Sequence, residues 1–69
     1  MPPSELKKLT PREREILALL AQGRLYKEIA GDLGISTSTV RAHLHSVYGK
    51  LGVASRTLAV LKFLSRPRG

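Results

Sequence analysis

Thirteen consecutive residues, 34–46, constrain the fold of this 69-residue chain more than any other segment. They read GISTSTVRAHLHS, in which a glycine can end one helix and a serine can cap the next. The helix that follows carries one apolar stripe at helical spacing, formed by Val40, Leu44, Val47 and Leu51. The segment therefore predicts a turn and then a helix with one buried face.

The opposite face of this helix carries short, polar or cationic side chains and no acid. Its members are Ser38, Arg41, Ala42 and His45. The major groove of DNA admits a helix that is anchored on one side and small and positive on the other. This face therefore predicts that the protein reads DNA.

Charge along the chain supports a polyanionic partner. The net charge is +7, and all five acids precede Gly34, whereas six cations and no acid follow it. A half-molecule of one sign creates a strong local potential, and nucleic acid is its commonest counterpart. The alternative, in which Lys and Arg only keep a small domain soluble, does not require one half to lack acids.

Length and composition set further limits. Sixty-nine residues suffice for one domain with a small core, and the absence of cysteine excludes disulfides and thiolate metal sites. No apolar run is long enough to span a bilayer or to form a signal peptide. We therefore expect no membrane partner and, by default, a cytoplasmic location.

Capping and breaking signals predict an all-α fold of four helices. Thr10 and Glu13 form a capping box, Gly23 and Gly52 can end helices, and Ser55 can cap the last one. The expected helices cover about residues 10–22, 26–33, 36–51 and 55–64. The expected organisation is a flexible lead-in at 1–8, a domain at 9–65 and a tail at 66–69.

The middle two helices meet the requirements of a helix-turn-helix unit. Close approach of the helices needs a small residue, which Ala30 supplies, and the turn needs a residue that tolerates positive φ, which Gly34 supplies. Ile35 can fill the corner, and Val40 can anchor the second helix. On the inner face of that helix we expect His43 to be packed and hydrogen-bonded.

Several separated motifs in a fixed order resemble the LuxR/GerE-type DNA-binding domain over about residues 9–64. They are LTPREREIL at 9–17, KEIA at 27–30, Ile35-Ser36, Thr39-Val40-Arg41, His43, KLGV at 50–53 and Arg56-Thr57. The resemblance implies a bundle of four helices with the third in the major groove and the fourth commonly forming a dimer contact. Many members are output domains of response regulators or quorum-sensing receptors.

Two positions depart from the family pattern. Leu25-Tyr26 stands where the family often has Ser-Asn, which weakens the expected cap of the second helix and offers Tyr26 as a phosphate contact. Gly49 stands where a larger residue is usual, at a cost of about 1 kcal/mol in helix propensity.

Arg41 is the leading candidate for base recognition, because its guanidinium can bond guanine O6 and N7. A phosphate clamp or a solvated arginine remains the alternative. His45 can reach a base or a phosphate, Ala42 can accept a thymine methyl, and Ser38 lies near the helix start. The expected base contacts are therefore Arg41, Ala42, His45 and Ser38.

The expected phosphate contacts combine hydroxyls with cations. They are Thr37, Thr39, Lys27, Lys50 and Tyr26, with a merely solvated lysine as the alternative for the two lysines. The expected dimer contacts on the fourth helix are Arg56, Thr57, Val60 and Leu61, and two copies would bind an inverted repeat.

Enzymatic and metal-binding functions find no support in the pattern. His43 and His45 are two residues apart on a helix and point in roughly opposite directions, so they cannot chelate one ion. Ser46 lies near His43, but no acid follows Asp32 to orient that histidine. We expect no catalysis, no cofactor and no small-molecule ligand.

The expected partners are double-stranded DNA and a second copy in a weak homodimer, with RNA polymerase as a further candidate. The chain is expected to be a transcriptional regulator, as the output domain of a two-component response regulator or another LuxR-family protein. Two alternatives remain: a helical protein-interaction module, and another promoter-binding helix-turn-helix such as a sigma-factor-like domain.

Overall fold

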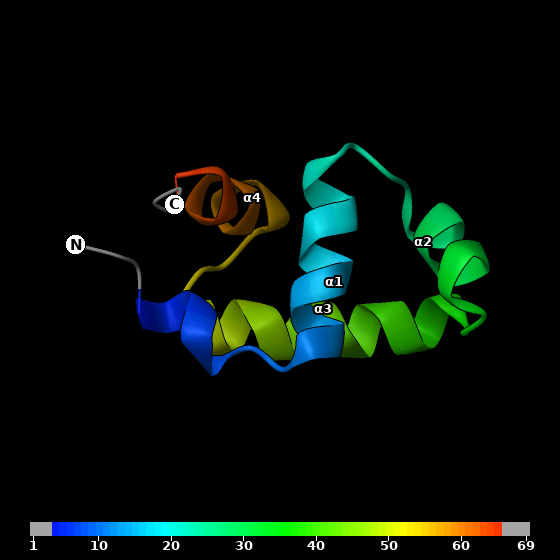
Figure 1. The fold of residues 1–69 in the computed structure, drawn as a ribbon, viewed down its shortest axis with the longest axis horizontal. Helices are drawn as coiled ribbons and strands as arrows, with labels where there is room; N and C mark the ends of the chain where they lie inside the picture. The colour runs from blue at the N-terminus through cyan, green and yellow to red at the C-terminus, as the bar shows by residue number, and fades with distance from the viewer. Residues whose placement is uncertain (1–3, 66–69) are drawn as a thin grey trace.

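The computed structural model describes residues 4–65, which form helices joined by short loops (Figure 1). The elements in order are the 3-10 helix η1 (Ser4–Lys8) and the α-helices α1 (Pro11–Ala21), α2 (Tyr26–Leu33), α3 (Thr37–Leu51) and α4 (Arg56–Leu64). The predicted all-α class with four α-helices is confirmed. Each predicted α-helix boundary lies within one residue of the observed one.

Side-chain caps fix where α1 and α3 begin. The Thr10 hydroxyl accepts a hydrogen bond from the Glu13 N–H at 3.1 Å, and the Glu13 carboxylate accepts one from the Thr10 N–H at 2.9 Å. Ser36 accepts from the Thr39 N–H at 3.0 Å. Each cap satisfies N–H groups that have no partner inside the helix. Local hydrogen bonds therefore fix the helix starts that the sequence predicts.

Helix α2 begins without a side-chain cap, because Leu25 has no acceptor. The Glu28 carboxylate instead accepts a hydrogen bond from the Leu25 N–H at 2.8 Å. This contact is one half of a capping box, and it also places negative charge at the positive end of the helix. It is the local compensation for the weak cap that the sequence predicts.

The turn between α2 and α3 depends on Gly34, whose φ of +66° lies in the left-handed region. The Ile35 N–H then bonds the Ala30 carbonyl at 3.0 Å, and Ile35 packs against the core. Ala30 is buried, as close approach of the two helices requires. The predicted roles of these three residues in the helix-turn-helix are confirmed.

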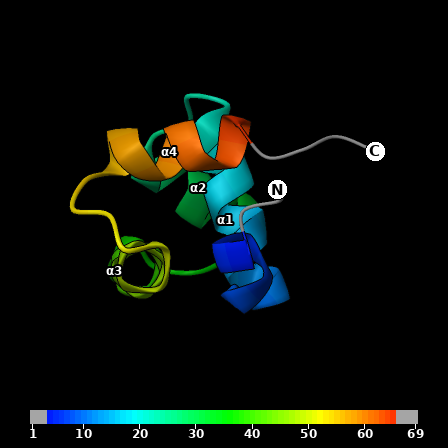
Figure 2. The same ribbon diagram turned by 90° about the vertical axis from the view of Figure 1, so that its left-hand side faces the viewer.

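The core lies where the four α-helices meet. Its largest fully buried side chains are Ile16, Leu17, Ile29, Val40, Leu44, Val47 and Leu51. In Figure 1, α3 runs along the base, α1 crosses it, and α2 and α4 lie towards its opposite ends. Figure 2 shows α3 nearly end-on, with one side free of the other helices. The whole predicted apolar stripe of α3 is therefore buried, and the opposite side faces solvent.

Within the predicted lead-in at 1–8, Ser4–Lys8 form η1, and Leu9 after it is buried. Leu6 and Leu9 are three residues apart, so both lie on the same side of this short turn and reach the core. His43 is half-buried and has no hydrogen-bond partner within residues 4–65, so its expected hydrogen bond is absent.

The predicted tail at 66–69 and the first three residues lie outside the described residues. Within residues 4–65, no helix has the length and apolar character that crossing a membrane requires.

Candidate nucleic-acid interface

The four predicted base-contacting side chains lie together on the solvent side of α3. Ser38, Arg41, Ala42 and His45 are all exposed, and we call this set the exposed face of α3. It lies opposite the buried stripe, because the two sets are offset by about half a turn of an α-helix. The free side of α3 in Figure 2 shows that no other described element covers it.

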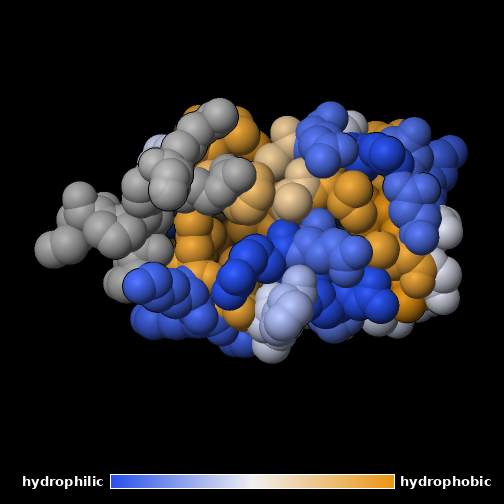
Figure 3. Space-filling model, viewed as in Figure 1, coloured by the Kyte–Doolittle hydropathy of each residue, from blue (hydrophilic) through white to orange (hydrophobic). Residues whose placement is uncertain are grey.

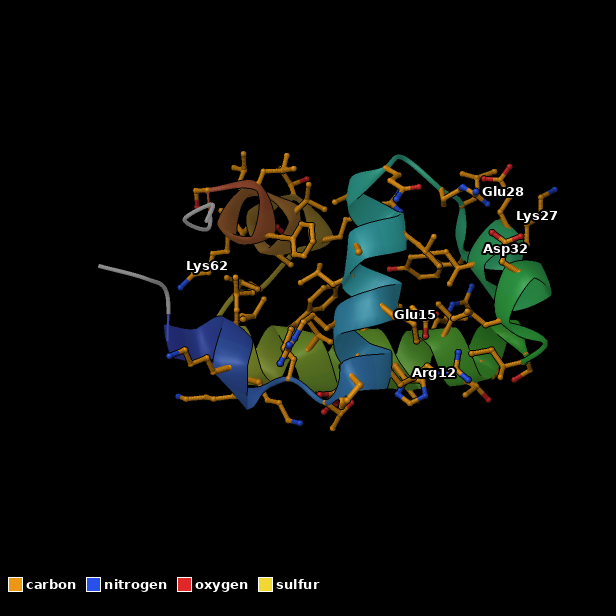
Figure 4. The ribbon with its side chains drawn as sticks, viewed as in Figure 1. Arg12, Glu15, Lys27, Glu28, Asp32 and Lys62 are labelled. Atoms are coloured by element: carbon orange, nitrogen blue, oxygen red, sulfur yellow. The ribbon has the colours of Figure 1, made fainter. Side chains whose placement is uncertain are left out.

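No acidic side chain within residues 6–65 forms an ion pair with Arg41. The acids have other partners: Glu15 pairs with Arg12, Asp32 with Arg24, Glu13 with Lys50, and Glu28 bonds the Leu25 N–H. Figure 4 shows Glu15 on α1 and Glu28 and Asp32 on α2. Three of these four acids therefore neutralise cations on other surfaces, and none of the four pairs with Arg41.

The start of α3 adds hydroxyls and backbone donors beside this face. Thr37 is half-buried, whereas Thr39 is exposed, and its hydroxyl lies 2.8 Å from the Ser36 hydroxyl. Ser36 caps only the Thr39 N–H, so the N–H groups of the first turn before it have no partner inside the helix. Such N–H groups favour anions.

Lys27 lies in the first turn of α2, is exposed, and forms no ion pair within residues 6–65. In Figure 4 its side chain extends outward from α2 beside Glu28. Its ammonium group is therefore available to a phosphate.

Lys50 has a different environment from Lys27. Its Nζ lies 2.8 Å from the Glu13 Oε1, and the Glu13 side chain is only 6% exposed. Burial alone would raise the pKa of Glu13, but hydrogen bonds from Lys50, the Thr10 N–H and Ser46 lower it to about 2. Glu13 therefore stays ionised, and Lys50 neutralises a buried carboxylate. The sequence did not reveal this pair, because 37 residues separate its members.

Tyr26 also has partners inside the domain. Its hydroxyl lies 3.3 Å from that of Tyr48, and the Arg56 guanidinium carbon lies 5.5 Å from the centre of its ring. Burial, and then the hydrogen bond with Tyr26, raise the pKa of Tyr48 well above its usual value. The Tyr48 hydroxyl therefore keeps its proton and can serve as a hydrogen-bond donor. These contacts join the starts of α2 and α4 to α3.

Helix α4 presents apolar side chains to solvent. Leu58, Leu61 and Leu64 are 48%, 56% and 54% exposed, and we call them the leucine stripe. Only Leu61 of this stripe is a predicted dimer contact. Of the other predicted dimer contacts, Arg56 and Thr57 are exposed and Val60 is half-buried. Figure 3 shows hydrophobic surface over α4 and hydrophilic surface over the lower part of α1 and over α3.

A groove of about 280 Å³ continues the apolar surface of α4 towards the loop between α1 and α2. Its lining is Leu20, Gly23, Arg24, Leu25, Arg56, Thr57, Val60 and Leu61. Leu25 is 51% exposed, so its side chain adds to the exposed apolar surface beside α4. Within residues 4–65, no group of three or more His, Asp or Glu side chains is placed to hold a metal ion.

Comparison with known proteins identifies the fold. The model of the family described as "Bacterial regulatory proteins, luxR family" matches residues 7–63. The chain is 48% identical over 61 residues to the "Probable HTH-type transcriptional regulator GfsR" of Streptomyces halstedii, covering 88% of this chain and 25% of that protein.

Two further relatives show the same likeness. The "Spore germination protein GerE" of Bacillus subtilis is 50% identical over 56 residues, covering 81% of this chain and 76% of that protein. The "Transcriptional activator protein CarR" of Pectobacterium carotovorum is 45% identical over 56 residues, covering 81% of this chain and 23% of that protein. This chain thus spans about a quarter of two of these relatives and three quarters of the other.

Proposed function

Because this chain belongs to the luxR family of bacterial regulatory proteins, which are DNA-binding transcriptional regulators, we propose that it reads double-stranded DNA with α3 in the major groove. The observation that carries this proposal is the exposed face of α3. It is free of acids, it bears Arg41 without a counter-ion within residues 6–65, and no described element covers it.

Base recognition falls to the exposed face of α3. Arg41 offers a bidentate donor for guanine, and a good pair of this kind discriminates by about 1–3 kcal/mol. His45 lies one turn further along, Ala42 leaves room for a thymine methyl, and Ser38 lies near the helix start. Few of these side chains can form several hydrogen bonds, so DNA shape is expected to add to specificity.

Phosphate contacts position the domain on the duplex. Lys27, Thr37 and Thr39 are the side chains that support this role, because they lie at the starts of α2 and α3. Lys50 is a weaker candidate than its sequence position implies, since Glu13 already holds its ammonium group. Tyr26 is likewise engaged with Tyr48 and Arg56.

Two copies of the chain are proposed to bind an inverted repeat through α4. The leucine stripe supports this proposal, because a two-fold axis near α4 would cover it with the same stripe of a second copy. Thr57 and Leu61 belong to this surface, and Val60 lies at its edge. In a longer protein the domain would act as the output module of a response regulator or related regulator in the bacterial cytoplasm, with RNA polymerase as a further partner.

The test begins with selection of preferred sites from a random DNA pool, followed by titration of the selected duplex and a scrambled one. Arg41→Ala should reduce the preference between the two duplexes about tenfold or more. Lys27→Ala should weaken binding to both duplexes alike and reduce the salt slope by about 1.

Arg12→Ala is the matched control, because Arg12 is paired with Glu15 on α1, and its removal should leave both binding properties unchanged. Binding by the unsubstituted protein that is independent of salt would contradict the proposal. Identical behaviour of the Arg41 and Lys27 variants would refute the division between base and phosphate contacts.

A further inference from the structure

Three side chains from three helices form a cluster. Arg56, the first residue of α4, lies over the ring of Tyr26, the first residue of α2, at 5.5 Å from its centre. Tyr48 of α3 holds the Tyr26 hydroxyl at 3.3 Å. Tyr26 is half-buried and Arg56 is exposed, so the ring is anchored while the guanidinium remains in contact with solvent.

The position of Arg56 on α4 separates it from Leu58 and Leu61 of the leucine stripe. At about 100° per residue, Arg56 lies about 160° around the helix from Leu58 and about 140° from Leu61, but only about 80° from Leu64. It lies instead on the same side as Phe63, which packs against the core. The stack on Tyr26 therefore turns the Arg56 guanidinium towards α2 and α3, although Arg56 also lines the groove that Val60 and Leu61 share.

The cluster also lies beside the residues proposed to bind DNA. Tyr48 follows Arg41 by seven residues, which places the two on the same flank of α3. Lys27 follows Tyr26 directly. Figure 2 shows the start of α4 above α3, on the side where the loop between them projects. Within residues 6–65, Arg56 has no acidic partner.

We propose that Tyr26 is a positioning residue for DNA binding, and that its ring holds the Arg56 guanidinium where it contacts a backbone phosphate. The proposal rests on the proposed function, because it needs α3 in the major groove. It assigns the phosphate contact to Arg56 and gives Tyr26 an indirect role. A guanidinium stacked on a ring keeps its planar edge of N–H donors free, and that edge matches a phosphate.

The experiment measures the dissociation constant for one duplex between about 50 and 300 mM salt, with the whole 69-residue chain. Arg56→Gln should reduce the salt slope by about 1, as loss of one phosphate contact does. Tyr26→Ala should reduce the slope by the same amount, and the double variant should lose no more than either single one. Tyr26→Phe should retain the slope, because it keeps the ring.

Thermal unfolding of each variant separates positioning from stability, since a destabilised but correctly assembled domain keeps the same number of phosphate contacts. If Tyr26→Ala does not fold, Tyr26→Leu replaces it, because leucine supplies a bulky apolar side chain without an aromatic face. Tyr26→Leu is then expected to show the same reduction of the salt slope. Lys27→Ala in the Tyr26→Ala background is the control for additivity, because the proposal predicts independent losses there.

Several results would overturn the proposal. An unchanged salt slope in Arg56→Gln would show that Arg56 makes no phosphate contact. Additive losses for Tyr26→Ala and Arg56→Gln would show that the two residues act independently. A loss in Tyr26→Phe equal to that in Tyr26→Ala would assign the contact to the tyrosine hydroxyl. If the proposed function itself is wrong, a different result is expected: Arg41→Ala would leave the preference between the two duplexes unchanged.

Discussion

Replacing Glu13 by glutamine is expected to cost this domain about 3 kcal/mol of unfolding free energy at pH 7. The pKa of Glu13 falls from 4.5 to about 2 on folding, and each pKa unit corresponds to about 1.4 kcal/mol. Glutamine can still accept the Thr10 N–H, so the loss isolates the charge and its pairing with Lys50. A domain of this size has roughly 3–10 kcal/mol in total, so the loss is a large fraction.

The sign of the pH dependence follows from the lowered pKa of Glu13. A carboxyl whose pKa is lower in the folded state contributes stability that is fully present above the unfolded value, near 4.5. The contribution is lost as pH falls towards the folded value of about 2. The difference in unfolding free energy between the unsubstituted protein and Glu13→Gln should therefore shrink through that interval, with about 2 kcal/mol lost by pH 3.

Urea unfolding followed by circular dichroism at pH 7, 4 and 3 measures this difference directly. Glu15→Gln is the matched control, because the Glu15–Arg12 pair is exposed and its loss should cost less than about 0.5 kcal/mol at each pH. A cost below about 0.5 kcal/mol for Glu13→Gln at pH 7 would refute the reasoning. A cost that persists unchanged at pH 3 would refute it as well.

Four further substitutions test the fold and the dimer. Gly49→Ala should raise the unfolding free energy by about 0.5–1 kcal/mol in urea unfolding, since a Cβ there meets no atom and the position is helical. Gly34→Ala should lower it by about 1–2 kcal/mol in the same assay, because φ is +66°. Ser36→Ala should lower the melting temperature through loss of a cap worth about 1 kcal/mol. Leu61→Glu should keep the monomer folded but abolish the preference for an inverted repeat over a single half-site in a mobility-shift titration.

The helix boundaries could be predicted because their signals are local. Thr10 and Ser36 lie within three residues of the N–H groups that they cap, and Gly34 adopts its left-handed conformation inside one turn. Helical spacing likewise gave the buried stripe of α3, because the same period decides which side faces the core. Helix boundaries and the buried side of a helix can therefore be predicted before the tertiary fold is known.

The partners of the candidate site could not be predicted, because they meet only in the folded domain. Twenty-two residues separate Tyr26 from Tyr48, and no spacing rule connects them. For Lys50, position near the end of α3 indicated a phosphate contact, but the buried carboxylate of Glu13 competes for the same charge. The twelve Lys and Arg residues include cations such as Lys50 that pair with an acid inside the fold, so their number overstates the cations offered to DNA.

The two apolar sides of α4 bear on how strongly two copies can associate. Ala59 is buried, whereas the leucines of the leucine stripe are about half exposed. Covering the exposed half of a leucine is worth about 1 kcal/mol, so six leucines in a symmetric pair supply about 6 kcal/mol. Association itself costs about 4–15 kcal/mol in lost freedom of motion. The balance predicts a weak dimer in free solution and a firmer one on DNA, where two adjacent half-sites already hold both copies in place.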